Sequence, residues 1–526
     1  MASFPHDKHA GSPAGGVVAR NYSGVWILVA TILGSSMGFI DATAVNVILP
    51  IMQEDLGATL TELQWFIEAY ALFLAALLLV GGTFGDRLGR KRVFMWGIGI
   101  FAGASIWAGL APNAEQLIAA RAVQGIGGAL FIPGSLALIG ACFTDSERGS
   151  AVGTWSSASA LTMALGPLLG GWLATEFSWR WVFFINVPLA AVVILICLTR
   201  VPESREQVSG KIDWLGAALA TVGLGALVYG LIESANLGFG HPEVVGTLGL
   251  GVAALIGFVV TELKVESPMI PLGVFKVRSF TGANIMTLLL YGGLGGAFFF
   301  VPLNLIQVQG YSATQAGASF LPFVLLIAVL SRYTGGLVPK IGAKIPLTVG
   351  PAIAGAGFLA FALQGVNEGS YWTTFFPAMV LFGVGMAITI APLVTVVMGT
   401  VPQSQSGLAS GVNNAVTRTG SLLAIAVFGV VALALFNGSL DDGLAAVDAP
   451  PAVVASLEDE RVELAGADLP PGLPPAQEAE LRNAIDEAFV DAFRGIMYIS
   501  AGLAFAGAIV ALFVIERRPK PRGAVG

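Results

Sequence analysis

The sequence predicts an all-α polytopic membrane protein, and three observations lead to this class. Hydrophobic residues make up 55% of the 526 residues and charged residues only 11%, whereas a soluble domain is about half apolar and about a quarter charged. Apolar runs of about 20 residues, the length that a helix needs to cross a bilayer, recur along the chain. Sixty-eight glycines favour close helix packing in lipid.

The apolar runs between polar breaks predict fourteen transmembrane helices. They cover residues 24–49, 63–84, 92–111, 115–140, 150–174, 180–199, 213–234, 244–262, 281–308, 314–337, 345–365, 372–398, 407–437 and 492–515. An even number of spans places both termini on one side. With the termini inside, the cytoplasmic segments hold 19 Lys and Arg and the outer segments hold 4. Because positive charge stays on the cytoplasmic side, we expect a plasma (inner) membrane protein with both termini in the cytoplasm.

A short internal echo predicts two six-helix units. GDRLGRK (85–91) is echoed by VPKIGAK (338–344), and each lies between the second and third spans of a unit if spans seven and eight are an insertion. The predicted organisation is a cytoplasmic tail (1–23), an N-terminal six-helix bundle (24–199), a linker with two extra helices (200–280), a C-terminal six-helix bundle (281–515) and a basic cytoplasmic tail (516–526).

The outer loop 438–491 differs from the rest of the chain. It contains thirteen Asp and Glu against two Arg, a net charge of −11. Its second part is typical of a Pro-rich turn followed by an amphipathic helix that leads into the last span. Two interpretations remain open, a solvated loop without further role and a vestibule that attracts cations.

Several chemistries are disfavoured. No lysine is followed by Ser or Thr, so the chain has no Walker A loop and does not use ATP through a site of its own. The three His show no HExxH spacing, and Cys142 and Cys197 lie in apolar runs as expected for unpaired core residues. We therefore expect no enzyme activity, no metal, no cofactor and no nucleic-acid partner.

Charged residues inside predicted spans are candidate functional residues, because such groups are costly in a bilayer. Asp41, Glu68 and Arg121 lie at depths of ~9–14 Å from the outer ends of their helices at 1.5 Å per residue. We expect them to share one layer and to couple protons, the alternative being static buried ion pairs. Arg418 lies in the thirteenth span, which has no acidic residue. It is either a substrate contact or a structural ion-pair partner.

Four further motifs accompany GDRLGRKR (85–92). They are FIDATAVNVILP (39–50), LIAARAVQGIGGA (117–129), GPLLGG (166–171) and WRWVFFINVP (179–188). Together they resemble, in the right order and helices, the motifs of the fourteen-span drug:proton antiporters of the major facilitator superfamily. The resemblance implies two six-helix bundles plus two inserted helices. It also implies alternating access of a central cavity from the two sides of the membrane.

The resemblance assigns expected roles to residues. Asp41 matches the first-helix Asp that handles protons, and Arg121 matches the fourth-helix Arg that tunes their exchange. Gly85, Asp86, Arg87, Gly89 and Arg90 match the gating motif. There the glycines permit a tight turn, and Asp86 pairs with nearby cations or a helix N-terminus. The alternative is that the basic residues only fix topology.

Two other groups of residues follow from the motifs. Gly166, Pro167, Gly170 and Gly171 match the fifth-helix antiporter motif, for which we expect a flexible, close-packed kink; simple packing is the alternative. Asn46, Gln124 and Asn186 are polar residues within the motifs, and with Arg418 they are candidate substrate or ion-pair contacts.

The expected function is therefore proton-coupled export of amphipathic small molecules, with cationic compounds among the candidates, by a monomer in the lipid bilayer. The proton gradient supplies the energy. Two alternatives stay open. One is export of a specific endogenous metabolite, lipid or peptide by the same fold, and the other is a membrane receptor that transports nothing.

Overall fold

A computed structural model describes residues 23–143, 145–205, 213–265, 268–270, 272–334, 337–366, 370–401 and 406–517. The tail 1–22 and residues 518–526 of the basic tail lie outside these ranges. In the described part, fourteen helices are long and apolar enough to cross a membrane. The predicted all-α class and the predicted number of spans are confirmed.

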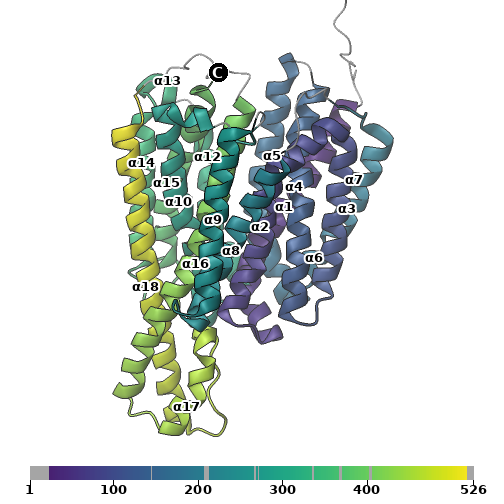
Figure 1. The fold of residues 1–526 in the computed structure, drawn as a ribbon. Coiled ribbons are helices and arrows are strands. Elements are labelled where there is room, and N and C mark those ends of the chain that lie inside the picture. The colour runs from purple at the N-terminus through teal and green to yellow at the C-terminus, as the bar shows by residue number, and fades with distance from the viewer. Residues whose placement is uncertain are drawn as a thin grey trace, which may run out of the picture.

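The first half of the chain forms one bundle, drawn in purple and blue in Figure 1. Its helices are α1 (Ser23–Leu56), α2 (Leu60–Leu88), α3 (Arg90–Gly109), α4 (Ala114–Cys142), α5 (Asp145–Glu176), α6 (Trp181–Phe184) and α7 (Asn186–Arg200). The short α6 and α7 together make the sixth span. We call this bundle the first half.

The second half forms a bundle beside it, drawn in green and yellow (Figure 1). Its elements are α10 (Arg278–Leu303), η2 (Asn304–Val308), α11 (Ala313–Ser319), α12 (Leu321–Thr334), α13 (Leu337–Ile341), α14 (Lys344–Phe361), α15 (Phe375–Gly399), α16 (Ser406–Ala446) and α18 (Pro475–Val514). The second spans of the two halves begin alike. Thr59 with Glu62 starts α2 and Ser312 with Gln315 starts α11, each as a capping box that satisfies the first backbone N–H groups.

The two inserted helices lie over the seam between the halves. They are α8 (Trp214–Leu237) and α9 (Pro242–Lys264), and the short η1 (Leu272–Lys276) leads from them into α10. Helix α8 contacts both α2 and α16, while α9 packs on α8. Leu72 of α2, Val228 of α8 and Leu422 of α16 belong to one buried apolar cluster.

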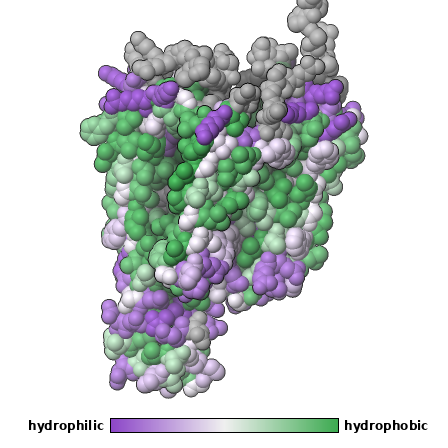
Figure 2. All heavy atoms as spheres, in the orientation of Figure 1, coloured by the Kyte–Doolittle hydropathy of each residue, from purple (hydrophilic) through white to green (hydrophobic). Residues whose placement is uncertain are grey.

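The molecule has two polar ends separated by an apolar belt, as Figure 2 shows. We call the end that carries the loop 85–92 and the end of α18 the basic end, and the opposite end, which carries α17, the acidic end. The belt is what a protein surrounded by lipid requires, because lipid cannot hydrate polar side chains.

Helix α1 runs farther than the sequence predicts. We expected the first span to end near Pro50, but α1 continues through Pro50 to Leu56. A proline removes one backbone hydrogen bond, but a helix in a membrane bundle can contain one because neighbouring helices satisfy the freed backbone group. Asp41 consequently lies near the middle of α1 and deeper than the sequence suggested.

Residues 438–491 are folded, and we call them the cap. The outer parts of α16 and α18 enclose α17 (Pro451–Glu460) and η4 (Arg461–Gly466). Leu440, Leu457, Leu464 and Ile485 are at most 2% exposed. The interpretation as a solvated loop is therefore wrong, because this segment folds around a buried apolar core.

The cap contacts both halves at the acidic end. The Gln53 side chain of α1 donates a hydrogen bond to the Glu463 carbonyl at 3.2 Å and accepts one from Gln307 of η2 at 2.8 Å. Gly466 lies against both glutamines. The cap thus covers the place where α1 and η2 meet.

Candidate functional site

A buried ion pair lies at the centre of the first half. The Arg121 guanidinium of α4 donates a hydrogen bond to the Asp41 carboxylate of α1. Asp41 is 0% exposed and Arg121 is 1% exposed. Charges in such a position require partners on every side, because solvent supplies none.

A chain of amides and hydroxyls surrounds the pair. Arg121 also donates to Gln124 Oε1 at 2.8 Å, and Gln124 Nε2 donates to Asp41 Oδ1 at 3.3 Å and to Ser105 Oγ at 2.8 Å. Asn186 Nδ2 donates to the same Ser105 oxygen at 3.3 Å. The network therefore joins α1, α3, α4 and α7, and it includes Gln124 and Asn186 from the predicted site.

Arg121 is further held by α2. Its Nε donates to the Phe66 carbonyl at 2.9 Å, and its guanidinium carbon lies 4.6 Å from the centre of the Tyr70 ring. The carbonyl and the ring face attract positive charge. Arg121 thus keeps some stabilising contacts whatever the charge of Asp41.

Glu68 of α2 makes no described hydrogen bond or ion pair with Asp41 or Arg121. It is 0% exposed, and neither carboxylate oxygen has a hydrogen-bond partner within the described part of the chain. Its neighbours on that side of α2 point toward α16: Gln64 donates to the Ile425 carbonyl at 2.6 Å. Among the described residues Asp41 and Arg121 are in contact and Glu68 is not bonded to either, so the expected shared layer of the three stays a prediction.

Arg418 makes no hydrogen bond or ion pair with any described residue, so its expected role as an ion-pair partner is not seen in this structure. It lies on α16 one turn before Ser421, whose hydroxyl donates to the Tyr291 carbonyl of α10 at 3.0 Å. Its helix also contacts α2 of the first half. Arg418 is therefore an unpaired positive charge at the interface of the halves.

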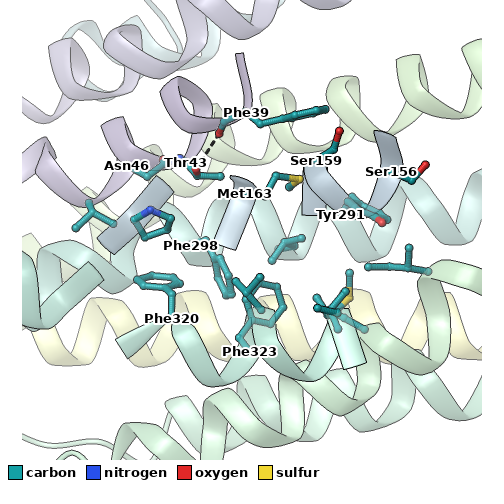
Figure 3. A pocket seen from close by; sticks show the side chains of 18 of the residues that line it. Phe39, Thr43, Asn46, Ser156, Ser159, Met163, Tyr291, Phe298, Phe320 and Phe323 are labelled. Atoms are coloured by element: carbon teal, nitrogen blue, oxygen red, sulfur yellow. Dashed lines mark hydrogen bonds between the residues drawn. The ribbon is translucent and has the colours of Figure 1, made fainter. Parts of the chain in front are cut away.

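A cavity of about 390 Å³ lies between the halves. Figure 3 shows its side chains converging from both halves. The lining residues are Phe39, Thr43, Asn46 and Val47 of α1, Trp155, Ser156, Ser159, Met163 and Pro167 of α5, Tyr291, Leu294 and Phe298 of α10, Phe320, Phe323, Val324, Ile327 and Ala328 at α12, and Met386 and Ile390 of α15. Asn46 thus lines the cavity, whereas Asp41 lies behind its wall.

The antiporter motif of α5 closes the cavity at the acidic end. Gly166 lies against Thr43 and Gly170 against Ala44, both of α1, and Gly171 lies against the Ala313 carbonyl of α11. Gly317 of α11 lies equally close to the Pro167 carbonyl. A side chain at either interface glycine would collide with backbone, and α5 runs through the motif as one helix. The motif is therefore closely packed, and the flexible kink stays a prediction.

Beyond these glycines the Thr175 and Thr314 hydroxyls are 3.1 Å apart. The described hydrogen bonds that join the two halves, including Gln53 with Gln307 and Gln64 with Ile425, all lie toward the acidic end. On α5 the cavity lining extends from Pro167 toward Trp155 and the exposed Ser156, that is, toward the basic end. The structure is therefore closed at the acidic end.

The GDRLGRKR motif forms a turn at the basic end. Gly89 has a φ of 111°, which favours glycine, whereas Gly85 is helical and belongs to α2. The prediction of two turn glycines is thus correct for Gly89 only. Asp86 accepts a hydrogen bond from Arg90 Nε at 2.8 Å. Of its two expected partners, a nearby cation or a helix N-terminus, this is the nearby cation. The Arg87 Nε is buried and has no partner within the described residues.

This turn docks on the segment that follows α7. The backbone N–H groups of Arg90 and Lys91 donate to the Ser204 carbonyl at 2.8 Å and to the Glu203 carboxylate at 3.0 Å. Both partners directly follow α7, the last helix of the first half. Asp86, Arg87 and Arg90 thus lie in a turn held by its own half.

Sequence reasoning missed Ser105, Glu203 and Gly317. Ser105 is a small polar residue in an apolar run, and its role depends on three other helices. Glu203 follows the sixth span and looks like any exposed loop acid, and Gly317 is one of many glycines. Cys142 and Cys197 are free as expected. Within the described ranges, no three His, Cys, Asp or Glu side chains are placed to hold a metal ion.

Comparison with known proteins gives the family. Residues 31–425 match the family model of the Major Facilitator Superfamily. The tetracenomycin C resistance and export protein of Streptomyces glaucescens is 30% identical in an alignment that covers 99% of this chain and 97% of that protein. The puromycin resistance protein of Streptomyces alboniger is 36% identical over 77% of this chain and 81% of its own length. The multidrug resistance protein Stp of Mycobacterium tuberculosis is 32% identical over 79% and 77%.

Solved structures share the fold at low identity. A bacterial homolog of the human lysosomal transporter Spinster aligns with a TM-score of 0.61 at 18% identity, covering 94% of this chain and 98% of its own. A POT family transporter in complex with 5-aminolevulinic acid aligns with a TM-score of 0.62 at 13% identity, covering 94% and 96%. With fourteen spans, two helical halves and a cavity between them, the chain belongs to the major facilitator superfamily and is a multi-pass membrane transporter, not an enzyme.

Proposed function

We propose that this transporter exports amphipathic, drug-like small molecules across the plasma membrane in exchange for protons, by alternating access and without a cofactor. Relatives named for tetracenomycin C export, puromycin resistance and multidrug resistance support the direction and the kind of cargo. The observation that carries the coupling is the buried Asp41–Arg121 pair directly behind the cavity wall.

The position of Asp41 links its charge to the cavity. Phe39 and Thr43, two residues before and after it, line the cavity, and α1 also meets α5 through Gly166 and Gly170. A proton on Asp41 removes the negative charge that Arg121 faces, and Arg121 keeps the Phe66 carbonyl and the Tyr70 ring. The pair therefore offers two charge states, each of which can favour a different position of α1.

Glu68 is the second proposed proton carrier. An ionised carboxylate without a partner is costly in such surroundings, so we propose that it holds a proton in this closed-at-the-acidic-end state. Its site contacts α16 of the other half, and movement of the halves would change its surroundings. Proton release from Glu68 would then accompany the opening of the acidic end.

We further propose that the basic end faces the cytoplasm, as the charge distribution favours. The structure then represents the inward-facing state, closed to the outside by α5, α11 and the cap. In this state Asp86 pairs with Arg90 within its own half. We propose that the turn 85–92 latches against the second half only when the cavity opens outward.

Proton-driven uptake of a fluorescent dye into inverted vesicles tests the coupling. We expect the gradient-dependent rate of uptake to fall about tenfold or more in Asp41→Asn, Glu68→Gln and Arg121→Ala. A tenfold fall corresponds to an activation free energy raised by about 1.4 kcal/mol. Gly153→Ala, at a glycine of α5 with open space around it, is the matched control and should transport normally. Transport at the wild-type rate by all three charge variants would refute the coupling.

A further inference from the structure

The lining of the cavity between the halves is aromatic and uncharged. Of the described residues that line it, none is charged, and six are aromatic. These six are Phe39, Trp155, Tyr291, Phe298, Phe320 and Phe323. The cavity therefore offers ring surfaces to a cargo and no carboxylate.

The acids of the transport core are kept out of the cavity. Asp41 and Glu68 are both 0% exposed, so neither can touch a molecule inside it. Asp41 is already engaged by Arg121 and Gln124. A cationic cargo would lose its hydration here without gaining an opposite charge.

The interface between the halves also holds an unpaired positive charge. Arg418 has no partner among the described residues, and it lies one turn from Ser421, which binds the backbone of the cavity residue Tyr291. Aromatic rings can attract cations through their faces. These rings also pack on one another, as Phe298 does with Phe320, Phe323 and Phe382 at ring-centre distances of 5.2–5.3 Å, and none of them carries the negative charge that would neutralise a permanent cation.

Two polar side chains of the lining can still orient a cargo, Asn46 directly and Ser159 once its enclosed hydroxyl turns toward the cavity. Ser159 is 7% exposed, and its hydroxyl has no hydrogen-bond partner within the described part of the chain. Asn46 donates through Nδ2 to the Ala42 carbonyl at 2.8 Å, which leaves its carbonyl oxygen available to the cavity. Figure 3 shows both residues on the same side of the cavity as Met163. They match a neutral cargo that carries carbonyl or hydroxyl groups on an aromatic ring system.

We propose that the cavity binds planar aromatic cargo that is uncharged where it is enclosed, and that it discriminates against permanent cations. This inference rests on the proposed export function and names its substrate class. Flat neutral rings bury apolar surface against the aromatic lining, while Ser159 and Asn46 hydrogen-bond to the polar substituents. A quaternary ammonium group is rejected because the cavity lining offers it no counter-ion.

Binding of two matched probes to the purified full-length protein tests the inference. Both are anthraquinone carboxamides, one with a side chain that ends in tert-butyl and the other with an isosteric trimethylammonium group. We expect the neutral probe to bind at least about tenfold more tightly by calorimetry. Equal or tighter binding of the cation, or no measurable binding of either probe, would overturn the proposal.

Added carboxylates provide the second arm. Asn46→Asp is nearly isosteric and should tighten cation binding by about tenfold relative to the neutral probe, whereas Asn46→Leu should weaken both probes alike. Ser159→Asp compared with Ser159→Asn repeats the test at an independent position. An unchanged ratio in both Asp variants, each confirmed to be folded, would contradict the inference.

The same probes separate this inference from the proposed coupling. Binding in detergent needs no gradient, so a tenfold preference for the neutral probe supports the cavity assignment even where gradient-driven transport fails. Conversely, Asp41-dependent export of the cation at the rate of the neutral probe would uphold the coupling and refute the substrate class.

Discussion

At the scale of single residues, the structure gives different environments to two carboxylates that the sequence presents alike. Asp41 is held by Arg121 and Gln124, and Glu68 by no described residue. Both are 0% exposed. An unsatisfied buried acid weakens a fold, and proteins retain such groups where function requires them.

We therefore expect Glu68→Met to stabilise the protein by about 1–3 kcal/mol while it abolishes proton-driven export, because the substitution removes an unpartnered polar group. Asp41→Leu should instead destabilise it by about 3–5 kcal/mol, since Arg121 loses its counter-ion. Thermal unfolding in detergent measures both changes. A lower stability of Glu68→Met would show that the carboxyl has a partner in the native protein.

The site could be predicted from the sequence only in part, for a physical reason. A charge within an apolar run is conspicuous, so Asp41, Glu68, Arg121 and Arg418 could be found directly. A transmembrane helix that is apolar all round gives no sign of which side faces which neighbour. The contact of Arg121 with the Phe66 carbonyl of α2, and the lack of a described partner for Glu68 on the same helix, could therefore be learned only from the packed structure.

At the scale of elements, the interface of α5 with α11 lies at the closed, acidic end of the cavity. Gly171 and Gly317 each lie against a backbone carbonyl of the partner helix. Such contacts let two helices approach closely, and any added side chain separates them. The sequence predicted this packing for α5 from its motif, but the α11 side carries no motif.

We expect Gly171→Ala to weaken closure at the acidic end and to reduce export by about tenfold or more, because the new Cβ would meet the Ala313 backbone. Disulfide trapping between cysteines introduced at Thr175 and Thr314 reports closure, and its yield should fall. Gly153→Ala in the same helix, where nothing lies within 4 Å of the added atom, is the control. Undiminished trapping in Gly171→Ala would argue against a closing role for this contact.

At the scale of the whole molecule, the fold was predicted more completely than the cap. Fourteen apolar runs fixed the number of spans, since length and hydropathy suffice for that. The boundaries shifted at α1, α16 and α18, which continue beyond the predicted spans. The cap was obscured because its acidic surface dominates the composition, although Leu457, Leu464 and Ile485 form its core.

Docking of the cap should depend on pH through Glu463. Burial, together with the nearby Glu460, Asp468 and Glu62, raises the pKa of Glu463 from 4.5 to about 7. Arg482 of α18, the basic residue placed beside this segment, binds the Ala465 and Ala467 carbonyls. Because the docked state binds the proton more tightly, docking is strongest below the ordinary pKa and weakens as the pH rises through about 7.

Hydrogen exchange measures this effect. Residues 461–466 should exchange faster at pH 8 than at pH 5, after correction for the intrinsic rates, and Glu463→Gln should remove the difference. Glu478→Gln changes an exposed acid of the same cap and should leave the difference intact. Identical profiles for wild type and Glu463→Gln would exclude this carboxyl as the titrating group.

The proposed orientation has its own test. In a background with Cys142→Ser and Cys197→Ser, a cysteine replacing the exposed Glu478 in the cap should react with an impermeant maleimide in intact cells. A cysteine replacing the exposed Lys340 at the basic end should react only after the membrane is permeabilised, because we place that end in the cytoplasm. The reverse pattern would invert the topology.

The inserted pair α8 and α9 has a consequence for how oily compounds arrive. Because α8 packs on both α2 and α16, it covers the interface of the two halves on one side of the molecule and separates it from the surrounding lipid. A compound dissolved in the bilayer meets a wall on that flank and must come from elsewhere. In the proposed alternating access the two halves tilt relative to each other. Because α8 packs on both α2 and α16, it would then have to slide along at least one of these two helices.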